Sequence, residues 1–162
     1  MMRTFLSGLA LLLLAGCSAY QLGGPKAAFR RIEIAPVRNS TPRPGTHAIL
    51  HNKLVEAFSS DPRVKVGGGD ALLTTEITQY HRDGLTTKST DAYVFSSYRV
   101  GFTVRCTLTT DGGRKVLFKD RDFTAHLTLQ AAGDSSAEEL SLGSNLFADI
   151  ASQIREAATT AW

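Results

Sequence analysis

The residue types that most often carry out catalysis stand in this chain without the neighbours that catalysis requires. His47 and His51 are four apart in a predicted helix, a spacing that can bring two imidazoles to one metal ion. The zinc-protease pattern also needs Glu directly after the first histidine, and Ala48 stands there. The chain lacks a Gly-x-Ser-x-Gly turn, and its glycine run at residues 67–69 lacks the Lys-Ser/Thr ending of a phosphate-binding loop. The sequence therefore predicts no enzyme, no metal site and no cofactor.

Basic residues offer a second kind of chemistry, the binding of anionic groups such as phosphates. Arginine suits this role because its planar guanidinium group pairs bidentately with phosphate. Asp120 and Asp122 would partly neutralise such a surface, and a solvated sheet face is the alternative interpretation. The candidate ligand-binding residues, chosen from charge and strand parity alone, are Arg99, Arg105, Lys119 and Arg121.

Cys17 stands in a pattern that indicates a covalent modification. A short positive start at residues 1–3 precedes ten mostly apolar residues at 5–14, far fewer than the ~20 that span a bilayer as a helix. Small residues then precede Cys17, as at the cut site of a secretory signal. The run Leu14-Ala15-Gly16-Cys17 resembles the bacterial lipobox. An ordinary signal peptide with a coincidental cysteine is the alternative.

The lipobox resemblance implies that residues 1–16 are removed and that Cys17 becomes the first residue of the mature chain. Its sulfur would carry a diacylglycerol and its amine a third acyl chain, which together hold a protein firmly to a membrane without spanning it. Ser18, rather than Asp, follows Cys17. In known bacterial lipoproteins this usually goes with export to the outer membrane. Residues 17–28 are then the lipidated N-terminus and a tether.

The remaining composition indicates one ordinary folded domain, which we place at residues 29–162. A length of 162 residues with 43% hydrophobic residues suits a single core. The formal net charge of +3 is too small to indicate nucleic-acid binding. Cys106 lies in an alternating apolar run and is expected to be a buried side chain. Lipidation would consume Cys17, so no intramolecular disulfide is expected.

Hydrophobic periodicity predicts the elements that must position these residues. Alternation predicts strands over residues 29–37, 71–82, 98–109 and 115–128, with a polar hairpin connection or mobile loop at 83–91. The Asp-Gly-Gly run at 111–113 marks a hairpin turn, and a phase change in the last strand predicts a β-bulge near residues 120–122. Apolar stripes predict helices over 47–59, with Thr46 as N-cap, and over 136–159, with Ser136 and Glu139 as a capping box.

The predicted order is therefore β-α-β-β-β-α. Helices packed on one face of a sheet give an α+β fold, a two-layer sandwich. We expect a mostly antiparallel four-stranded sheet with both helices on one face.

The chain resembles the LptE family of lipopolysaccharide-assembly lipoproteins over nearly its whole mature length. Residues 16–24 are similar to the start of that family, where the lipidated cysteine precedes an aromatic residue and then leucine. Residues 32–41 resemble its first strand and the Asn-x-Thr-like turn that follows. Residues 54–64 resemble the next helix and loop, and residues 98–118 its central hairpin.

The family resemblance implies a role without catalysis. Proteins of the LptE family sit at the outer membrane, plug the β-barrel protein LptD, support its assembly and bind lipopolysaccharide during its export to the outer leaflet. The expected partners are an LptD-type barrel, lipopolysaccharide, and the membrane through the N-terminal acyl chains. The domain would face the periplasm or the barrel lumen. The implied fold, a four-stranded sheet with two helices, agrees with the periodicity.

A lipoprotein regulator that activates a periplasmic cell-wall synthase is the alternative function. Such regulators share a lipobox and a small α/β domain but usually carry a longer tether. Eleven residues, 18–28, separate Cys17 from the first predicted strand. Because an extended chain spans at most ~3.3–3.6 Å per residue, the domain must stay near the membrane, which favours the barrel-associated role.

Overall fold

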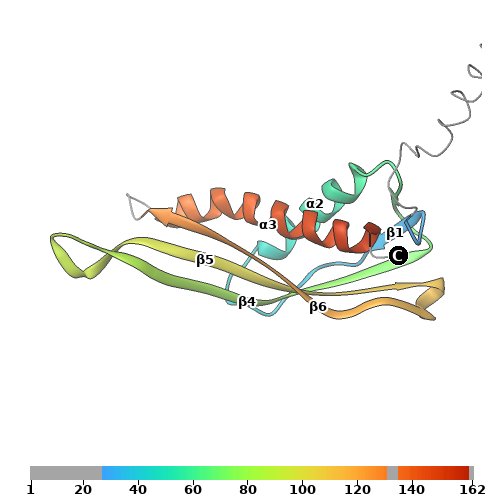
Figure 1. Cartoon of the computed structure of the whole chain (residues 1–162), viewed down its shortest axis with the longest axis horizontal. Coiled ribbons are helices and arrows are strands. Elements are labelled where there is room, and N and C mark those ends of the chain that lie inside the picture. Colours follow the sequence, from blue (N-terminus) through green and yellow to red (C-terminus); the bar gives the residue numbers. More distant parts are fainter. Residues whose placement is uncertain (1–26, 131–134, 161–162) are drawn as a thin grey trace, which may run out of the picture.

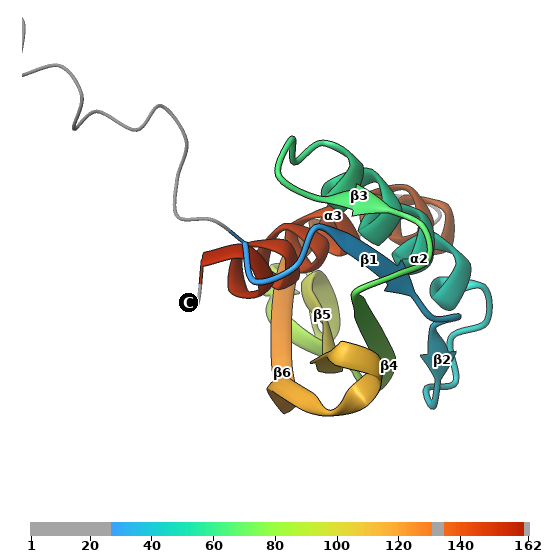
Figure 2. The same cartoon turned by 90° about the vertical axis from the view of Figure 1, so that its right-hand side faces the viewer.

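A long, twisted sheet carries two helices on one of its faces, as Figure 1 and Figure 2 show. The computed structural model describes residues 27–130 and 135–160, without the side chains of residue 92 and of residues 135–142. The predicted signal peptide, Cys17 and the side chains of Ser136 and Glu139 lie outside the described parts. The elements are β1 Arg31–Ile34, β2 Arg38–Asn39, α2 Thr46–Ser59, β3 Lys65–Val66, β4 Ala71–Lys88, β5 Asp91–Thr110, the 3-10 turn η2 Asp111–Gly113, β6 Lys115–Gln130 and α3 Ser135–Thr160.

The sheet corrects the expectation of four mostly antiparallel strands. Within the described residues it has six strands in a mixed arrangement, ordered β3-β1-β4-β5-β6, with β2 beside β4. The strands β4, β5 and β6 are antiparallel, but β1 runs parallel to β3 and β4, and β2 runs parallel to β4. The prediction was wrong because α2 lies between β1 and β4 in sequence, and a strand-helix-strand crossover leaves its two strands parallel. The two-residue strands β2 and β3 are too short to leave an alternating pattern.

The hairpin of β4 and β5 is longer than the sequence predicted. Residues 83–91, expected as a connection, mostly continue the ladder, with Asp83 opposite Arg99 and Lys88 opposite Asp91. Strand alternation in a sequence arises when one face is buried. Residues 81–88 are all exposed, so no such alternation could reveal this part of β4. Figure 1 shows the hairpin projecting past the end of α3.

The strands β5 and β6 otherwise follow the sequence prediction. Alternate residues from Val100 to Leu108 are buried. The turn at η2 uses three successive positive φ angles, 54°, 64° and 90°. Cys106 of β5 pairs with Arg121 of β6, and Leu108 pairs with Phe118. One residue of β5 therefore lies opposite two residues of β6, so β6 contains one extra residue. The predicted bulge is thereby confirmed at Lys119–Asp120, where Asp120 has φ of 49°.

The two helices bury the apolar stripes that the sequence predicted. Phe58 from α2 and Phe147, Ile150 and Ile154 from α3 are almost completely buried, and the rings of Phe147 and Phe102 lie 4.9 Å apart. Thr46, however, does not cap α2. It is the first helical residue, Gly45 precedes it with φ of 79°, and its hydroxyl donates to the Arg43 carbonyl at 2.9 Å. A residue without Cβ adopts this left-handed conformation easily, so glycine makes the sharp entry.

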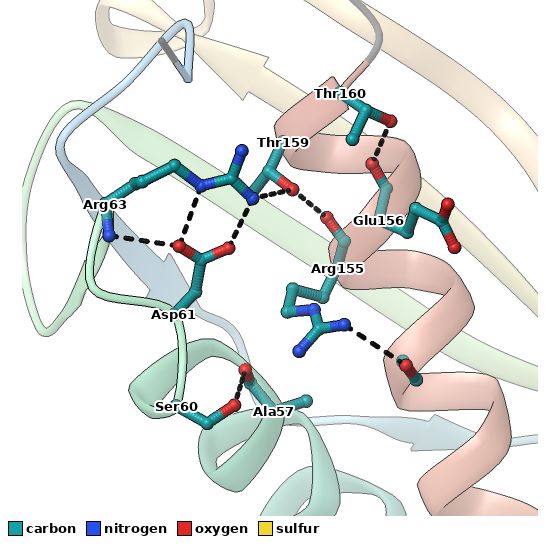
Figure 3. Close-up of polar contacts among 9 residues, drawn as sticks. Ala57, Ser60, Asp61, Arg63, Arg155, Glu156, Thr159 and Thr160 are labelled. Carbon is teal, nitrogen blue, oxygen red and sulfur yellow. Dashed lines mark hydrogen bonds and ion pairs between the residues drawn. The ribbon is translucent and has the colours of Figure 1, made fainter. Parts of the chain in front are cut away.

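A polar clamp of Asp61, Arg63 and Thr159 ties the segment after α2 to the end of α3 (Figure 3). The Asp61 carboxylate accepts a hydrogen bond from the backbone N–H of Arg63 at 3.0 Å and two from the Arg63 guanidinium at 2.9 and 2.6 Å. The same guanidinium donates to the Thr159 hydroxyl at 3.0 Å. The hydrogen bond from Arg63 holds the pKa of Asp61 below its ordinary value. The clamp joins residues 96 apart in sequence and so fixes α3 against α2.

Candidate functional site

The face of the sheet away from the helices carries two of the four predicted ligand-binding residues. Arg99 and Arg105 share this outer face because they alternate with the buried residues of β5. They are six residues apart on one strand, roughly 20 Å at the rise of a β-strand. Arg99 is exposed and makes no ion pair with the described residues.

Arg105 is already paired. Its guanidinium donates to both carboxylate oxygens of Asp122 across the β5–β6 ladder, at 2.9 and 3.1 Å. This hydrogen bonding raises the pKa of Arg105 above its ordinary value. Glu76 lies opposite Arg105 on β4 and pairs with Arg38 at 3.6 Å. The surroundings of Arg105 are therefore charge-balanced rather than basic.

The other two predicted residues lie elsewhere. Lys119 is exposed in the bulge of β6. Arg121 pairs with Cys106, so its side chain leaves the sheet on the helix side, since cross-strand partners share a face. There its guanidinium lies 5.2 Å from the ring centre of Phe123, beside α3. The structure thus places Arg99 and Arg105 on one face, Arg121 on the other and Lys119 in the bulge, and it does not gather the four cations into one surface.

An apolar pocket on the helix side is a site that sequence reasoning missed. It has a volume of about 210 Å³ and opens between α2, α3 and strands β5 and β6. Its apolar lining is Ile49, Val100, Phe102, Leu127, Leu146 and Phe147. Arg43 lies on its lining and donates a hydrogen bond to the Tyr80 hydroxyl. Such a pocket can take up hydrocarbon, with a polar group left near its mouth.

Aromatic side chains continue from this pocket along the β4–β5 hairpin. Tyr80 packs on Phe102 at 5.0 Å, the guanidinium of Arg82 lies 4.3 Å from the ring centre of Tyr98, and Phe95 lies 5.7 Å from Tyr98. A Cβ at Gly84 would overlap the Phe95 ring, so the glycine makes room for it. The alternate spacing of Tyr80, Arg82 and Gly84 in the sequence could have indicated that these residues share one face of a strand. The sequence prediction ended this strand at residue 82, so it did not include Gly84.

The end of the hairpin, which we call the distal ribbon (residues 82–97), exposes apolar surface. Tyr93 is 95% exposed, and Leu85, Val94 and Phe95 are each about 40% exposed. Among the described residues, this ribbon consists of two strands only, β4 and β5. Ser97 is the exception, because it also pairs with Gln130 of β6. Because two strands alone are marginally stable in water, the ribbon is suited to gaining order from a partner.

Among the side chains that the structure describes, groups that could carry out catalysis do not converge. Within residues 27–130 and 135–160, no three metal-binding side chains gather. His47 and His51 both line a small pocket at the start of α2, and the buried His51 Nδ1 has no hydrogen-bond partner among the described residues. Burial raises the pKa of the Cys106 thiol to about 12, so it stays protonated at neutral pH. No helix in the described part of the chain is long and apolar enough to cross a membrane.

Comparison with known protein families gives one match that spans the domain. The family model for LptE, described as lipopolysaccharide-assembly, matches residues 29–158. That range begins before β1 and ends in the last turn of α3, so it includes every strand and both helices. No curated protein matches the chain at a significant level.

Several solved lipoproteins share the fold. A minor lipoprotein from Acinetobacter baumannii has 15% identity and a TM-score of 0.54, over 79% of this chain and 91% of that one. Lipoprotein B from Nitrosomonas europaea has 15% identity and a TM-score of 0.59, over 86% and 90%. Rare lipoprotein B from Shewanella oneidensis has 12% identity and a TM-score of 0.51, over 77% and 90%. At these identities the likeness concerns the fold alone.

Proposed function

The chain belongs to the LptE family of lipopolysaccharide-assembly proteins, and from that premise we propose that it is an outer-membrane lipoprotein that plugs and helps assemble an LptD-type β-barrel. It binds lipopolysaccharide during its export to the outer leaflet, and it does so without catalysing a reaction. The observation that carries this proposal is the family match over residues 29–158, which takes in the whole described fold. The lipobox-like run ending at Cys17 supports the anchoring.

The shape of the domain supports the barrel-associated role. The distal ribbon projects past α3 and exposes Leu85, Tyr93, Val94 and Phe95. Exposed apolar side chains at the end of a long element are a cost in water and a gain at a protein interface. The short tether before β1 keeps the domain beside the membrane that holds Cys17.

Two features support lipopolysaccharide binding. The apolar pocket between α2, α3 and the sheet can accommodate part of an acyl chain. The outer face carries Arg99 and Arg105, and the bulge carries Lys119, which can meet phosphates. Arg99 and Lys119 are the stronger choices, because Arg105 is paired with Asp122 and Arg121 lies on the other face.

Purification of the full-length chain from a mild-detergent extract of total cell membranes tests the proposed function. We expect a large β-barrel protein to copurify in a defined ratio, identified by mass spectrometry. Recovery of an inner-membrane cell-wall synthase in place of a barrel would support the regulator alternative and reject the proposal.

Lipopolysaccharide binding is tested separately by charge reversal. Arg99→Glu combined with Lys119→Glu should weaken binding to purified lipopolysaccharide by about tenfold, since two charge-assisted contacts are lost. Arg105→Gln, which removes a cation already paired, is the matched control and should change binding much less. Equal binding by the wild type and the double variant would remove Arg99 and Lys119 from the site.

A further inference from the structure

The outermost strand of the described sheet, β6, has one edge with which no other described strand pairs, and we call this edge open. Figure 2 shows β6 at one side of the sheet, and the strand order ends with it in the described part of the chain. Open edges invite pairing with other strands, and proteins usually block them with lysines, bulges or coverage. The first half of β6 has such protection in Lys115, Lys119 and Arg121 and in the bulge at Lys119–Asp120. The second half, residues 123–130, has no charged residue and no bulge.

The direction of individual backbone groups along this second half follows from two hydrogen bonds. The Thr124 carbonyl accepts the Gln153 side chain of α3 at 3.4 Å, so this carbonyl points away from β5. Thr103 of β5 pairs with Thr124, and the Thr103 carbonyl points toward β4, where it accepts a hydrogen bond from the Thr78 hydroxyl at 3.2 Å. In antiparallel strands such outward-pointing residues alternate with residues bonded to the neighbour. The N–H and C=O groups of Thr124, His126 and Thr128 therefore face the open edge.

A groove lies at the start of this edge. It has a volume of about 570 Å³ and lies between β6 and α3, lined from the strand by residues 121–124 and from the helix by residues that include Gln153, Glu156 and Ala157. Phe123 and Ala157 give it an apolar side. The groove also holds Arg121 and Asp122, and Asp122 is paired with Arg105. The Glu156 carboxylate makes no ion pair with the described residues, so it is available to a cation.

We propose that the open edge of β6, over residues 123–130, is a docking site at which an extended segment of the barrel partner adds as a further strand. Alternate backbone groups of the segment would bond Thr124, His126 and Thr128, and a basic side chain of the segment would lie beside Glu156. Gln153 covers the Thr124 carbonyl in the unbound protein and swings away on docking. This inference rests on the proposed function, because it assigns the strand to that partner.

A segment without its own covering helix fits this edge better than a second copy of the chain. Two copies joined through their β6 edges would form one continuous sheet. Each copy would then bring its α3 onto the helix side of that sheet, next to the groove that the other α3 already borders. An isolated extended segment brings no such obstruction.

Thr124→Pro tests the site, because proline removes one outward N–H and leaves the bonds to β5 in place. With the full-length protein and its copurified barrel, we expect Thr124→Pro to lower the retained barrel by about tenfold. Thr124→Val keeps the N–H and should retain the barrel as the wild type does. Gln153→Ala uncovers the Thr124 carbonyl and should raise retention, a gain that misfolding cannot produce.

Amide hydrogen exchange on the wild-type complex gives a readout that needs no variant. The amides of Thr124, His126 and Thr128 should become protected only when the barrel is bound. Equal barrel retention by Thr124→Pro and Thr124→Val, with these amides unprotected in the complex, would overturn strand addition and leave the proposed function standing. Failure of the wild type to retain any barrel would reject the proposed function and this site with it. A concentration-dependent dimer lost in Thr124→Pro would identify a second copy as the occupant instead.

Discussion

At the scale of single residues, the described side chains with altered pKa values either form ion pairs or lie in the core. Arg63 lowers the pKa of Asp61 by donating hydrogen bonds to it, and Asp122 raises the pKa of Arg105 by accepting them. Burial raises the pKa of Cys106. Perturbed acidity in a cleft often indicates catalysis, but these groups lie in a clamp, on a sheet face and in the core.

Asp61→Asn should lower the free energy of unfolding at pH 7 by about 2 kcal/mol, because it breaks a largely buried ion pair whose arginine is partly exposed. Because the pKa of Asp61 is lower in the folded protein, its ionisation stabilises the fold at pH values above the ordinary pKa of 3.8. This stabilisation is lost as the pH falls through the lowered pKa. The gap between wild type and variant should therefore shrink below pH 3.8 in urea unfolding. Glu33→Gln, at an exposed carboxylate, is the control. A gap that stayed constant with pH would show that Asp61 ionisation does not matter.

Cys106 should resist alkylation in the folded protein. Its thiol is buried, and its pKa of about 12 leaves almost no thiolate at pH 8. In a Cys17→Ser variant, where Cys106 is the sole cysteine, iodoacetamide should label the chain only after unfolding in guanidinium. Rapid labelling under native conditions would mean that β5 opens locally.

At the scale of elements, the β4–β5 hairpin has two halves with different roles. The inner half lies in the sheet and supplies Ile77, Val104 and Cys106 to the core. The distal ribbon contributes no buried apolar side chain among those described, and its residues 83–91 are exposed where described. Stability should therefore reside in the inner half and α3, while the ribbon is available for contact with a partner.

Replacing residues 87–96 by a two-residue Asn-Gly turn, which joins the paired residues Thr86 and Ser97, should leave the fold intact, because none of the removed side chains that the structure describes is buried. The free energy of unfolding should change by less than about 1 kcal/mol in urea titration. Phe147→Ala, which empties a fully buried position against Phe102, is the contrasting variant and should cost about 3 kcal/mol or more. A shortened hairpin that unfolds as readily as Phe147→Ala would show that the ribbon is structural.

At the scale of the whole molecule, the start of the described chain and the distal ribbon lie at opposite ends. The described chain begins at Ala27, next to β1, while the tip of the β4–β5 hairpin projects at the other end of the long axis (Figure 1). The β4 strand alone has 18 residues, roughly 60 Å at the rise of a strand. If Cys17 is lipidated, the membrane holds one end and the exposed apolar ribbon is free to reach a partner.

Cys17→Ala should remove acylation and release the protein from the outer membrane, or leave it unprocessed in the inner membrane. The reason is that the predicted lipid anchor depends on that sulfur and on the amine that processing would free. Acyl labelling and membrane fractionation provide the measurement. Cys106→Ala, which alters the other cysteine, should keep both label and location. Unchanged labelling and fractionation of Cys17→Ala would disprove lipidation at this position.

The sequence by itself determined the features that arise from local burial. The alternation in β5, the Asp-Gly-Gly turn, the bulge at Asp120 and the apolar stripes of both helices could all be predicted, because each leaves a periodic or turn-specific pattern. Family resemblance also came from order and spacing along the chain, and the match over residues 29–158 confirms it.

Only the tertiary structure decided what depends on contacts between distant residues. The parallel pairing of β1 with β4 follows from the path of α2, and the two-residue strands β2 and β3 exist only because they pair with longer ones. Four cations that looked like one group were separated by strand pairing, with Arg105 opposite Asp122 and Arg121 on the helix side. Charge along a sequence fixes neither the face nor the partner, because both are set by the register across the sheet.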